Sequence, residues 1–284
     1  MNNYHFYKNY SDELTCVEFL FSFYKDVVKT CPKCGSEKIK WTLKNKGWRC
    51  NTCTSKISLK SVSFLRDSNK KYSEWLEIIF LLLNSKKALS ISEIVRLSRQ
   101  TCYNTVYHMV RKIDNELGFI NQLEASEFKT IIPFDSEDNP SPEFPSELTF
   151  QFSLTKSRTK DKIRLVLSQE RKKKILNQKC NCLNTKKYSF PKVLSIGIDL
   201  LQCSLPLNEK NIKSKWRNTI KENILRVING IHHEIKGFHL QAKLDEYSFK
   251  YNYRHSKTPK LLVFFQRLIQ SIGKIQRTHI PRLD

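Results

Sequence analysis

The chain has 284 residues and a formal net charge of +23 at neutral pH, with 50 Lys and Arg against 27 Asp and Glu. Hydrophobic residues make up 39% of it and are well distributed, so long disorder is not expected. The longest apolar run, 78–83, is far shorter than the ~20 residues of a membrane-spanning helix, and the N-terminus lacks the pattern of a secretory signal. These features exclude a membrane protein and predict an intracellular, soluble one. The charge favours nucleic acid as a partner, although a lysine-rich composition without function would give the same charge.

Four of the nine cysteines lie close together near the N-terminus. Cys31 and Cys34 form one C-x-x-C pair, Cys50 and Cys53 form another, and 35–49 separate them. This spacing predicts a four-thiolate zinc site, in which each pair forms a turn that directs two sulfurs at one ion. Four thiolates fill the tetrahedron, so the zinc is expected to be structural. IKWTL and GWRC, joined at KNKG, predict a hairpin between the pairs, and the whole segment reads as a zinc ribbon. The alternative is four cysteines without metal.

Three blocks of helical periodicity follow the ribbon within 72–117. Ser90 and Glu93 form a capping-box pattern that predicts a short helix over Ile91–Leu97, and a tight turn at Ser98 leads into a longer helix. This order is typical of a helix-turn-helix, whose second helix enters the major groove of DNA. An ordinary helical hairpin with a solvated polar face is the alternative.

The longer helix is expected to have a buried face and a DNA-facing side. The buried face would hold Cys102, Val106, Met109, Val110, Ile113 and Leu117. The DNA-facing side would hold Arg99, Gln100, Thr101, Tyr103, Asn104, Tyr107 and Arg111. Gln100 and Asn104 are the predicted base contacts, because amide side chains pair with adenine edges.

The order of these segments resembles the insertion-sequence transposases of the ISXO-like group, which are related to the Merlin elements of animals. DELTCVEFLFSFYKDVVKTCPKCGS is similar to the family's short helix and zinc ribbon, and ISEIVRLSRQTCYNTVYHMVRKI to its helix-turn-helix. The most specific likeness is HLQAKLDEYSFKYNYRH at 239–255, which resembles the family signature HLQxYLDEFxFRYNRR. The resemblance implies a ribonuclease H-like domain in which three carboxylates hold two divalent metals, Mg or Mn, that cut and join DNA strands.

Two of the three acids that the resemblance implies are replaced. Ser126 in LEASE stands where the family has its first aspartate, and Lys213 in KNIKSKWRNTIK stands where it has its glutamate. No site for the second aspartate is evident, and Asp199, after an apolar stretch, is a weak candidate. If the alignment with the family's acids is shifted by a few residues, the candidate catalytic carboxylates are Glu124, Glu127, Asp135 and Glu209.

We therefore expect a multidomain α/β protein with three parts. These are an N-terminal helix and zinc ribbon (1–60), a helical helix-turn-helix domain (61–120) and a partly eroded ribonuclease H-like domain (121–284). Thr258 and Pro259 are expected to begin the last helix, and helices from the two halves can pack together. Asp245 and Glu246 are expected to order local structure, because neighbouring helical residues cannot both face one metal.

The leading hypothesis is a transposase-like DNA-binding protein that is catalytically inactive. One alternative is an active DDE-type transposase that uses Mg or Mn, and another is a zinc-ribbon module that binds a protein. The expected partner is double-stranded DNA at element ends, and the resemblance suggests a homo-oligomer. The expected compartment is nuclear in a eukaryotic host and cytoplasmic otherwise.

Overall fold

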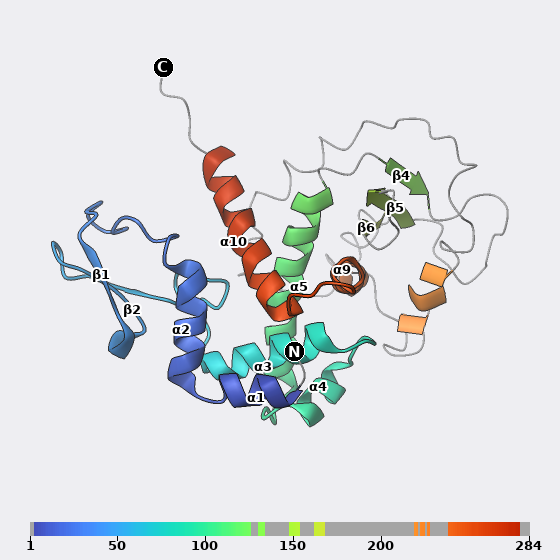
Figure 1. The fold of residues 1–284 in the computed structure, drawn as a ribbon, viewed down its shortest axis with the longest axis horizontal. Helices are drawn as coiled ribbons and strands as arrows, with labels where there is room; N and C mark the ends of the chain where they lie inside the picture. The colour runs from blue at the N-terminus through green and yellow to red at the C-terminus, as the bar shows by residue number, and fades with distance from the viewer. Residues whose placement is uncertain are drawn as a thin grey trace, which may run out of the picture. The chain divides into compact units, whose positions relative to one another are not determined.

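The fold is seen in a computed structural model (Figure 1). It describes residues 3–125, 130–133, 148–153, 162–167, 219–220, 222–224, 226–227 and 238–278. The chain divides into two compact units: the first unit comprises Met1–Glu116 and Ser256–Asp284, and the second unit comprises Leu117–His255. The described residues form helices and two small antiparallel sheets, which is compatible with the expected mixed α/β class. None of the described helices is both long enough and apolar enough to cross a membrane.

The first unit has a helical core around α3. Its helices are α1 (Asn3–Tyr10), α2 (Glu13–Tyr24), α3 (Tyr72–Asn84), α4 (Ile91–Leu97), α10 (Lys260–Thr278) and most of α5 (Tyr103–Ala125), which ends in the second unit. Nine side chains of α3 are buried, as expected for a helix that other elements surround. The Glu13 carboxylate of α2 accepts hydrogen bonds from the backbone N–H groups of Tyr72 (3.1 Å) and Ser73 (3.0 Å), which caps the start of α3.

The C-terminal helix α10 belongs to the first unit. It packs on α2 and α3, and it buries Phe264 and Phe265. The Phe265 ring lies 5.6 Å from that of Phe19 in α2, and the Phe264 ring lies 5.8 Å from that of Phe64. Helices from the two ends of the chain therefore pack together. The expected third domain, 121–284, does not hold as one unit, because its last helix completes the core of the first.

The start of α10 differs slightly from its prediction. The helix begins at Lys260, and the Pro259 carbonyl accepts a hydrogen bond from the Val263 N–H at 3.1 Å. Pro259 thus stands at the cap position rather than in the first turn, and Thr258 lies outside the helix. The cause is local: the Ser256 hydroxyl hydrogen-bonds both the N–H and the carbonyl of Thr258, which holds that residue in a turn.

The ribbon within the first unit is a three-stranded antiparallel sheet. It consists of β1 (Ile39–Thr42), the short helix η1 (Leu43–Asn45), β2 (Gly47–Cys50) and β3 (Lys56–Ser58), in the order β1-β2-β3. The predicted hairpin is confirmed, and Lys46 makes its tight turn with a φ of 48°. A Cβ on Gly47 would lie 2.3 Å from the Ile57 carbonyl oxygen, so only glycine fits where β2 and β3 approach.

The second unit contains a sheet and a helix that packs on it. The sheet consists of β4 (Thr130–Pro133), β5 (Leu148–Ser153) and β6 (Lys162–Leu167), all antiparallel in the order β4-β5-β6. The helix α9 (Phe238–Asn252), which carries most of the C-terminal signature, packs against β6. These elements fit a mixed α/β unit, and their membership of a ribonuclease H-like fold stays a prediction.

Candidate metal centre and helix-turn-helix

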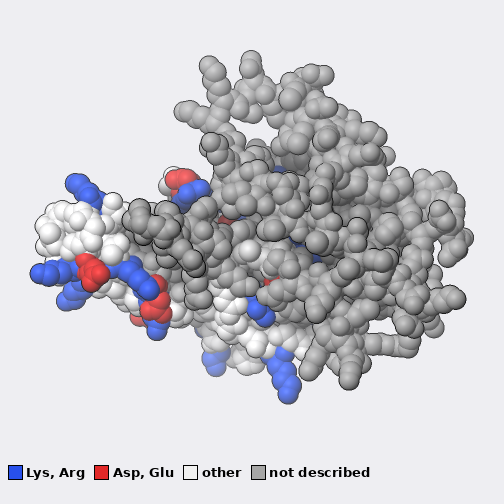
Figure 2. Space-filling model, turned by 90° about the horizontal axis from the view of Figure 1, so that it is seen from above, with Lys and Arg blue, Asp and Glu red and all other residues white. Residues whose placement is uncertain are grey.

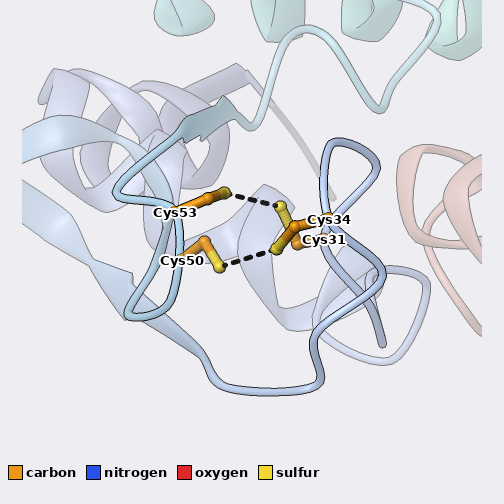
Figure 3. Close-up of side chains that lie close together, drawn as sticks. All are labelled: Cys31, Cys34, Cys50 and Cys53. Atoms are coloured by element: carbon orange, nitrogen blue, oxygen red, sulfur yellow. Dashed lines mark hydrogen bonds between the residues drawn. The ribbon is translucent and has the colours of Figure 1, made fainter.

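The four predicted cysteines converge on one point (Figure 3). Their sulfur atoms all lie within 4.8 Å of one another. Cys31 Sγ lies 3.5 Å from Cys53 Sγ, and Cys34 Sγ lies 3.6 Å from Cys50 Sγ. Zn–S bonds of about 2.3 Å place the corners of a tetrahedral ZnS4 site about 3.8 Å apart, whereas sulfurs in a disulfide are about 2.05 Å apart. The cysteines are therefore close enough to bind one metal ion such as zinc, as predicted.

Each cysteine pair lies in a turn that ends in a left-handed residue. Gly35 follows the first pair with a φ of +70°, and Thr54 follows the second with a φ of +58°. The Gly35 N–H donates to the Cys31 carbonyl at 2.8 Å, and the Cys50 N–H donates to the Ser55 carbonyl at 3.0 Å. The sequence indicates this role for the glycine. It gives no such signal for Thr54, because a β-branched residue rarely adopts a positive φ.

Ser55 is a neighbour of the site that sequence reasoning missed. Its hydroxyl oxygen lies 3.1 Å from the sulfurs of both Cys31 and Cys53. The Ser55 hydrogen bond lowers the pKa of Cys31 to about 6 and also lowers the pKa of Cys53. The pKa of Cys34 rises to about 12: the Ser36 N–H favours its thiolate, but hydrogen bonds with the other thiols favour its protonated form more. Four thiolates this close repel one another, so a cation among them is needed for all to ionise.

The predicted short helix is confirmed, and the next helix begins later than predicted, at Tyr103. Ser90 Oγ accepts a hydrogen bond from the Glu93 N–H at 3.1 Å and caps α4. In a complete capping box the Glu93 carboxylate would accept a hydrogen bond from the Ser90 N–H. In this structure it pairs with Arg96 at 2.6 Å. A connection over 98–102 then leads to α5. The helix–connection–helix order is thus present, and its role in binding DNA stays a prediction.

Most of the side chains predicted to face DNA are exposed, but Gln100 is not. Arg99, Thr101, Tyr103 and Asn104 are exposed, and Tyr107 and Arg111 are half-buried. Gln100 keeps only 5% of its surface exposed. The prediction that Gln100 lies on an exposed face is therefore wrong, and its role as a base contact stays a prediction. The physical reason is that Gln100 lies in the connection, where the helical periodicity used to place it does not apply.

Cys102 differs from its prediction in the opposite sense. It was expected on the buried face of the long helix, but it is exposed and precedes that helix. Its carbonyl accepts a hydrogen bond from the Val106 N–H at 3.2 Å, so it caps α5. The hydrogen bond from the Thr105 N–H lowers the pKa of its thiol. The other predicted core residues, Val106, Met109, Val110, Ile113 and Leu117, are buried as expected.

A buried carboxylate of α3 holds the connection between α4 and α5. Glu77, which is 3% exposed, accepts hydrogen bonds from the Arg99 N–H at 3.4 Å and from the Tyr7 hydroxyl at 2.9 Å. Burial, aided by this bond, raises the pKa of Tyr7 to about 12. The Arg99 side chain is 56% exposed, but its Nε lies 3.9 Å from Glu77 Oε1 and its guanidinium lies over the Tyr7 ring at 5.8 Å, so Glu77 and Tyr7 hold both its backbone and its side chain. Sequence reasoning missed Glu77, although one carboxylate in an apolar run is the signal that identifies such a residue.

The C-terminal signature binds the outer edge of β6. Asn252 Oδ1 accepts a hydrogen bond from the Ile163 N–H at 2.7 Å, and its Nδ2 donates to the Ile163 carbonyl at 2.9 Å. Ser248 Oγ accepts from the Leu165 N–H at 3.3 Å, and Gln241 Nε2 donates to the Leu165 carbonyl at 3.0 Å. One face of α9 thereby supplies the hydrogen bonds that a neighbouring strand would make.

The two acids in the signature order local structure, as expected. Asp245 lies 3.9 Å from Arg164 of β6. Glu246 pairs with Lys243 at 2.8 Å and with Lys250 at 2.7 Å. Burial alone would raise the pKa of Glu246, but the two lysines lower it to about 2. The carboxylates therefore have different partners and do not form a common metal site.

The predicted catalytic positions are largely beyond the described part of the chain. Ser126, Glu127, Asp135, Asp199, Glu209 and Lys213 all lie outside the described residues. Glu124 is described, and its carboxylate accepts a hydrogen bond from the Tyr253 hydroxyl. The replacement of two catalytic acids thus stays a prediction from sequence.

Comparison of the chain with protein-family models, with curated proteins and with solved structures gave no match. The resemblance to ISXO-like transposases therefore stays a prediction that depends on the motifs themselves. The function is inferred below from those motifs and from the geometry of the described residues.

Proposed function

We propose that the protein is a transposase-derived DNA-binding protein that no longer cuts DNA. It binds duplex DNA at element ends through the start of α5, and its ribbon is folded around one structural zinc ion. Cys31, Cys34, Cys50 and Cys53 would hold this ion. Because four thiolates leave no position for water, the zinc would stabilise the ribbon and supply no hydrolytic chemistry.

The observation that carries the proposal is the group of side chains exposed around the start of α5. Leu97 and Tyr103 are 46% and 52% exposed, and they are two of the four large apolar side chains that are exposed among the described residues. Arg99 and Asn104 are exposed beside them. Arginine binds guanine or phosphate, asparagine binds adenine, and apolar groups contact the thymine methyl. This combination suits a helix end in the major groove.

The proposed loss of catalysis follows from the alignment of Ser126 and Lys213 with two of the three acids of the family. A hydroxyl at Ser126 and an ammonium at Lys213 cannot replace carboxylates that hold two divalent cations, because Mg²⁺ and Mn²⁺ need anionic oxygen ligands. Mg or Mn would be required only if the register is shifted and other acids act. The active transposase is therefore the main competing outcome of the test.

The proposal is tested by mobility shift and strand transfer with the full chain loaded with zinc. The DNA is a duplex that carries the ends of the element encoding the chain, and the cleavage reactions contain Mg²⁺ or Mn²⁺. We expect specific binding without a metal-dependent product. Asn104→Ala should weaken specific binding about tenfold or more, since one base contact contributes roughly 1–3 kcal/mol. Asn115→Ala, an exposed asparagine further along α5, is the matched control.

Each outcome separates the competing functions. A cleaved or joined product would overturn the proposed loss of catalysis and support the active transposase. Failure to bind any duplex would overturn the DNA-binding role and leave the ribbon as a protein-interaction module. Equal losses for Asn104→Ala and Asn115→Ala would show that the start of α5 does not read bases.

A further inference from the structure

A row of three cations crosses the ribbon sheet. Lys40 of β1 is paired in register with Arg49 of β2, and Arg49 is paired with Lys56 of β3. All three residues are exposed. Lys and Arg side chains project from the ribbon end of the first unit, at the left of Figure 2. We call Lys40, Arg49 and Lys56 the cationic row.

The cationic row works against the stability of the ribbon. Neighbouring strands lie about 4.8 Å apart, and like charges directly opposite each other are destabilising. Among the ion pairs of the described residues, none includes a member of the row. The segment 29–60 has nine Lys and Arg residues and one acid, Glu37. Folding of the ribbon therefore does not explain the row, whereas an external polyanion does.

The opposite face of the same sheet packs against α2. Trp41 pairs with Trp48, and Trp48 pairs with Ile57, at the alternate positions of the three strands. Trp48 and Ile57 are buried, and the Phe21 ring of α2 stacks on Trp41 at 4.1 Å. The sheet thus has an aromatic face that docks on α2 and a cationic face that is exposed to solvent.

We propose that the cationic row binds the phosphate backbone of duplex DNA. The proposal rests on the DNA-binding function proposed above and adds a second contact surface, so that the ribbon holds DNA as well as metal. Contacts with phosphates fix the position of a protein on the duplex without reading its sequence. The row would thereby raise the affinity of the start of α5 for every sequence to the same extent.

The chemistry of the exposed face favours duplex over other polyanions. The large apolar side chains that are exposed among the described residues are Tyr4, Leu14, Leu97 and Tyr103, and all lie outside the ribbon. A membrane surface needs apolar side chains that enter the lipid, and a single strand needs aromatic rings on which bases stack. The backbone of a duplex needs only cations.

The test is the salt dependence of DNA binding by the zinc-loaded full chain. The variant Lys40→Gln, Arg49→Gln, Lys56→Gln removes the row and keeps long polar side chains. The matched control Lys8→Gln, Lys25→Gln, Lys257→Gln removes the same charge from exposed positions outside the ribbon. Zinc content and circular dichroism must match the wild type in both, which excludes loss of the ribbon as the cause.

We expect the row variant to bind element ends and random duplex about tenfold or more weakly, by the same factor for both. The slope of log K against log salt should fall by about 2 to 3, since each phosphate contact contributes roughly 0.9. The control should change the slope by less than about 1. An unchanged slope, or equal changes in variant and control, would overturn the proposal.

Other probes distinguish failure of this proposal from failure of the proposed function. Binding of random duplex that depends on the row, without preference for element ends, would support the row and overturn specific recognition. No binding of any duplex by the wild type would overturn both. Row-dependent binding that is tighter to anionic vesicles, a dT oligomer or duplex RNA than to duplex DNA would overturn the assigned partner.

Discussion

The side-chain amide of Asn252 forms two hydrogen bonds with the backbone of one residue, Ile163, accepting from its N–H and donating to its carbonyl. An amide has one acceptor and one donor group, as a peptide unit has, so it can replace the partner that an edge strand lacks. Three residues on one face of α9, Gln241, Ser248 and Asn252, form such hydrogen bonds with the backbone of β6. The side chains of α9 thus satisfy the backbone groups at the edge of the sheet.

Asn252→Asp should destabilise the second unit. The aspartate keeps the shape of the side chain but places an oxygen against the Ile163 carbonyl, where the amide donated a hydrogen bond. We expect the free energy of unfolding to fall by about 1–3 kcal/mol, with faster hydrogen exchange in 162–167. Asn115→Asp, at an exposed position of α5, should change neither quantity. Equal exchange rates in the two variants would contradict this role for Asn252.

Stability should depend on pH through Glu116. Burial raises the pKa of its carboxyl from 4.5 to about 7, and the nearby Arg66 opposes this shift in part. Because the folded state holds the proton more tightly than the unfolded state, the contribution to stability is complete below about pH 4.5. It is lost as the pH rises to about 7.

Glu116→Gln tests this dependence, since glutamine mimics the protonated acid. At pH 8 the variant should unfold with a higher free energy than the wild type, by on the order of 2 kcal/mol. The difference should shrink as the pH is lowered to about 5. Urea unfolding at each pH measures it, and Glu18→Gln, an exposed carboxylate of α2, is the control. A difference that does not vary with pH would refute the assignment.

Cys34→Ser should weaken metal binding by the ribbon. Three thiolates bind zinc less tightly than four, and the free energy of metal binding is part of the folding free energy of such a small segment. We expect bound zinc to fall well below one equivalent, with a change in the fluorescence of Trp41 and Trp48. Cys102→Ser, outside the ribbon, should keep the metal. Full zinc content in the Cys34 variant would exclude a four-cysteine site.

Thr54→Gly should stabilise the metal centre slightly. The threonine adopts a φ of 58°, which is unfavourable for a β-branched residue, and glycine removes that strain. We expect slower loss of zinc to a chelator and a gain of at most about 1 kcal/mol, because glycine also loses more entropy on folding. Thr52→Gly in the same turn should have the opposite effect, since its hydroxyl bonds Ser36 at 2.8 Å. The same sign for both variants would count against strain at Thr54.

Local patterns in the sequence predict local structure well in this chain. The spacing of the cysteines predicts their convergence, and Ser90 predicts the start of α4. The predicted exposure of Gln100 is wrong because Gln100 lies in the connection before α5, where helical periodicity does not apply. The hydrogen bond from the Arg99 N–H to Glu77 of α3 holds this connection, and the residues next to Arg99 in the sequence do not indicate that contact.

Contacts between distant segments explain the rest of what the sequence did not reveal. Gln241, Ser248 and Asn252 form a polar helical face that reads as solvent-exposed, and only the backbone of β6 shows why they are polar. The packing of α10 also depends on residues far away in the sequence. Its apolar face predicts burial, but its partners in α2 and α3 lie more than 170 residues earlier in the chain.

The first unit is discontinuous in the chain, and this has a consequence for its synthesis. At about 5–20 residues per second, roughly 10–35 s pass between the emergence of α3 and that of α10. During that interval the apolar surface of α2 and α3 has no α10 to cover it and is open to chaperones or to other chains. A premature stop anywhere before α10 would leave this surface permanently exposed, so we expect the first unit to be unstable in any chain that ends before α10.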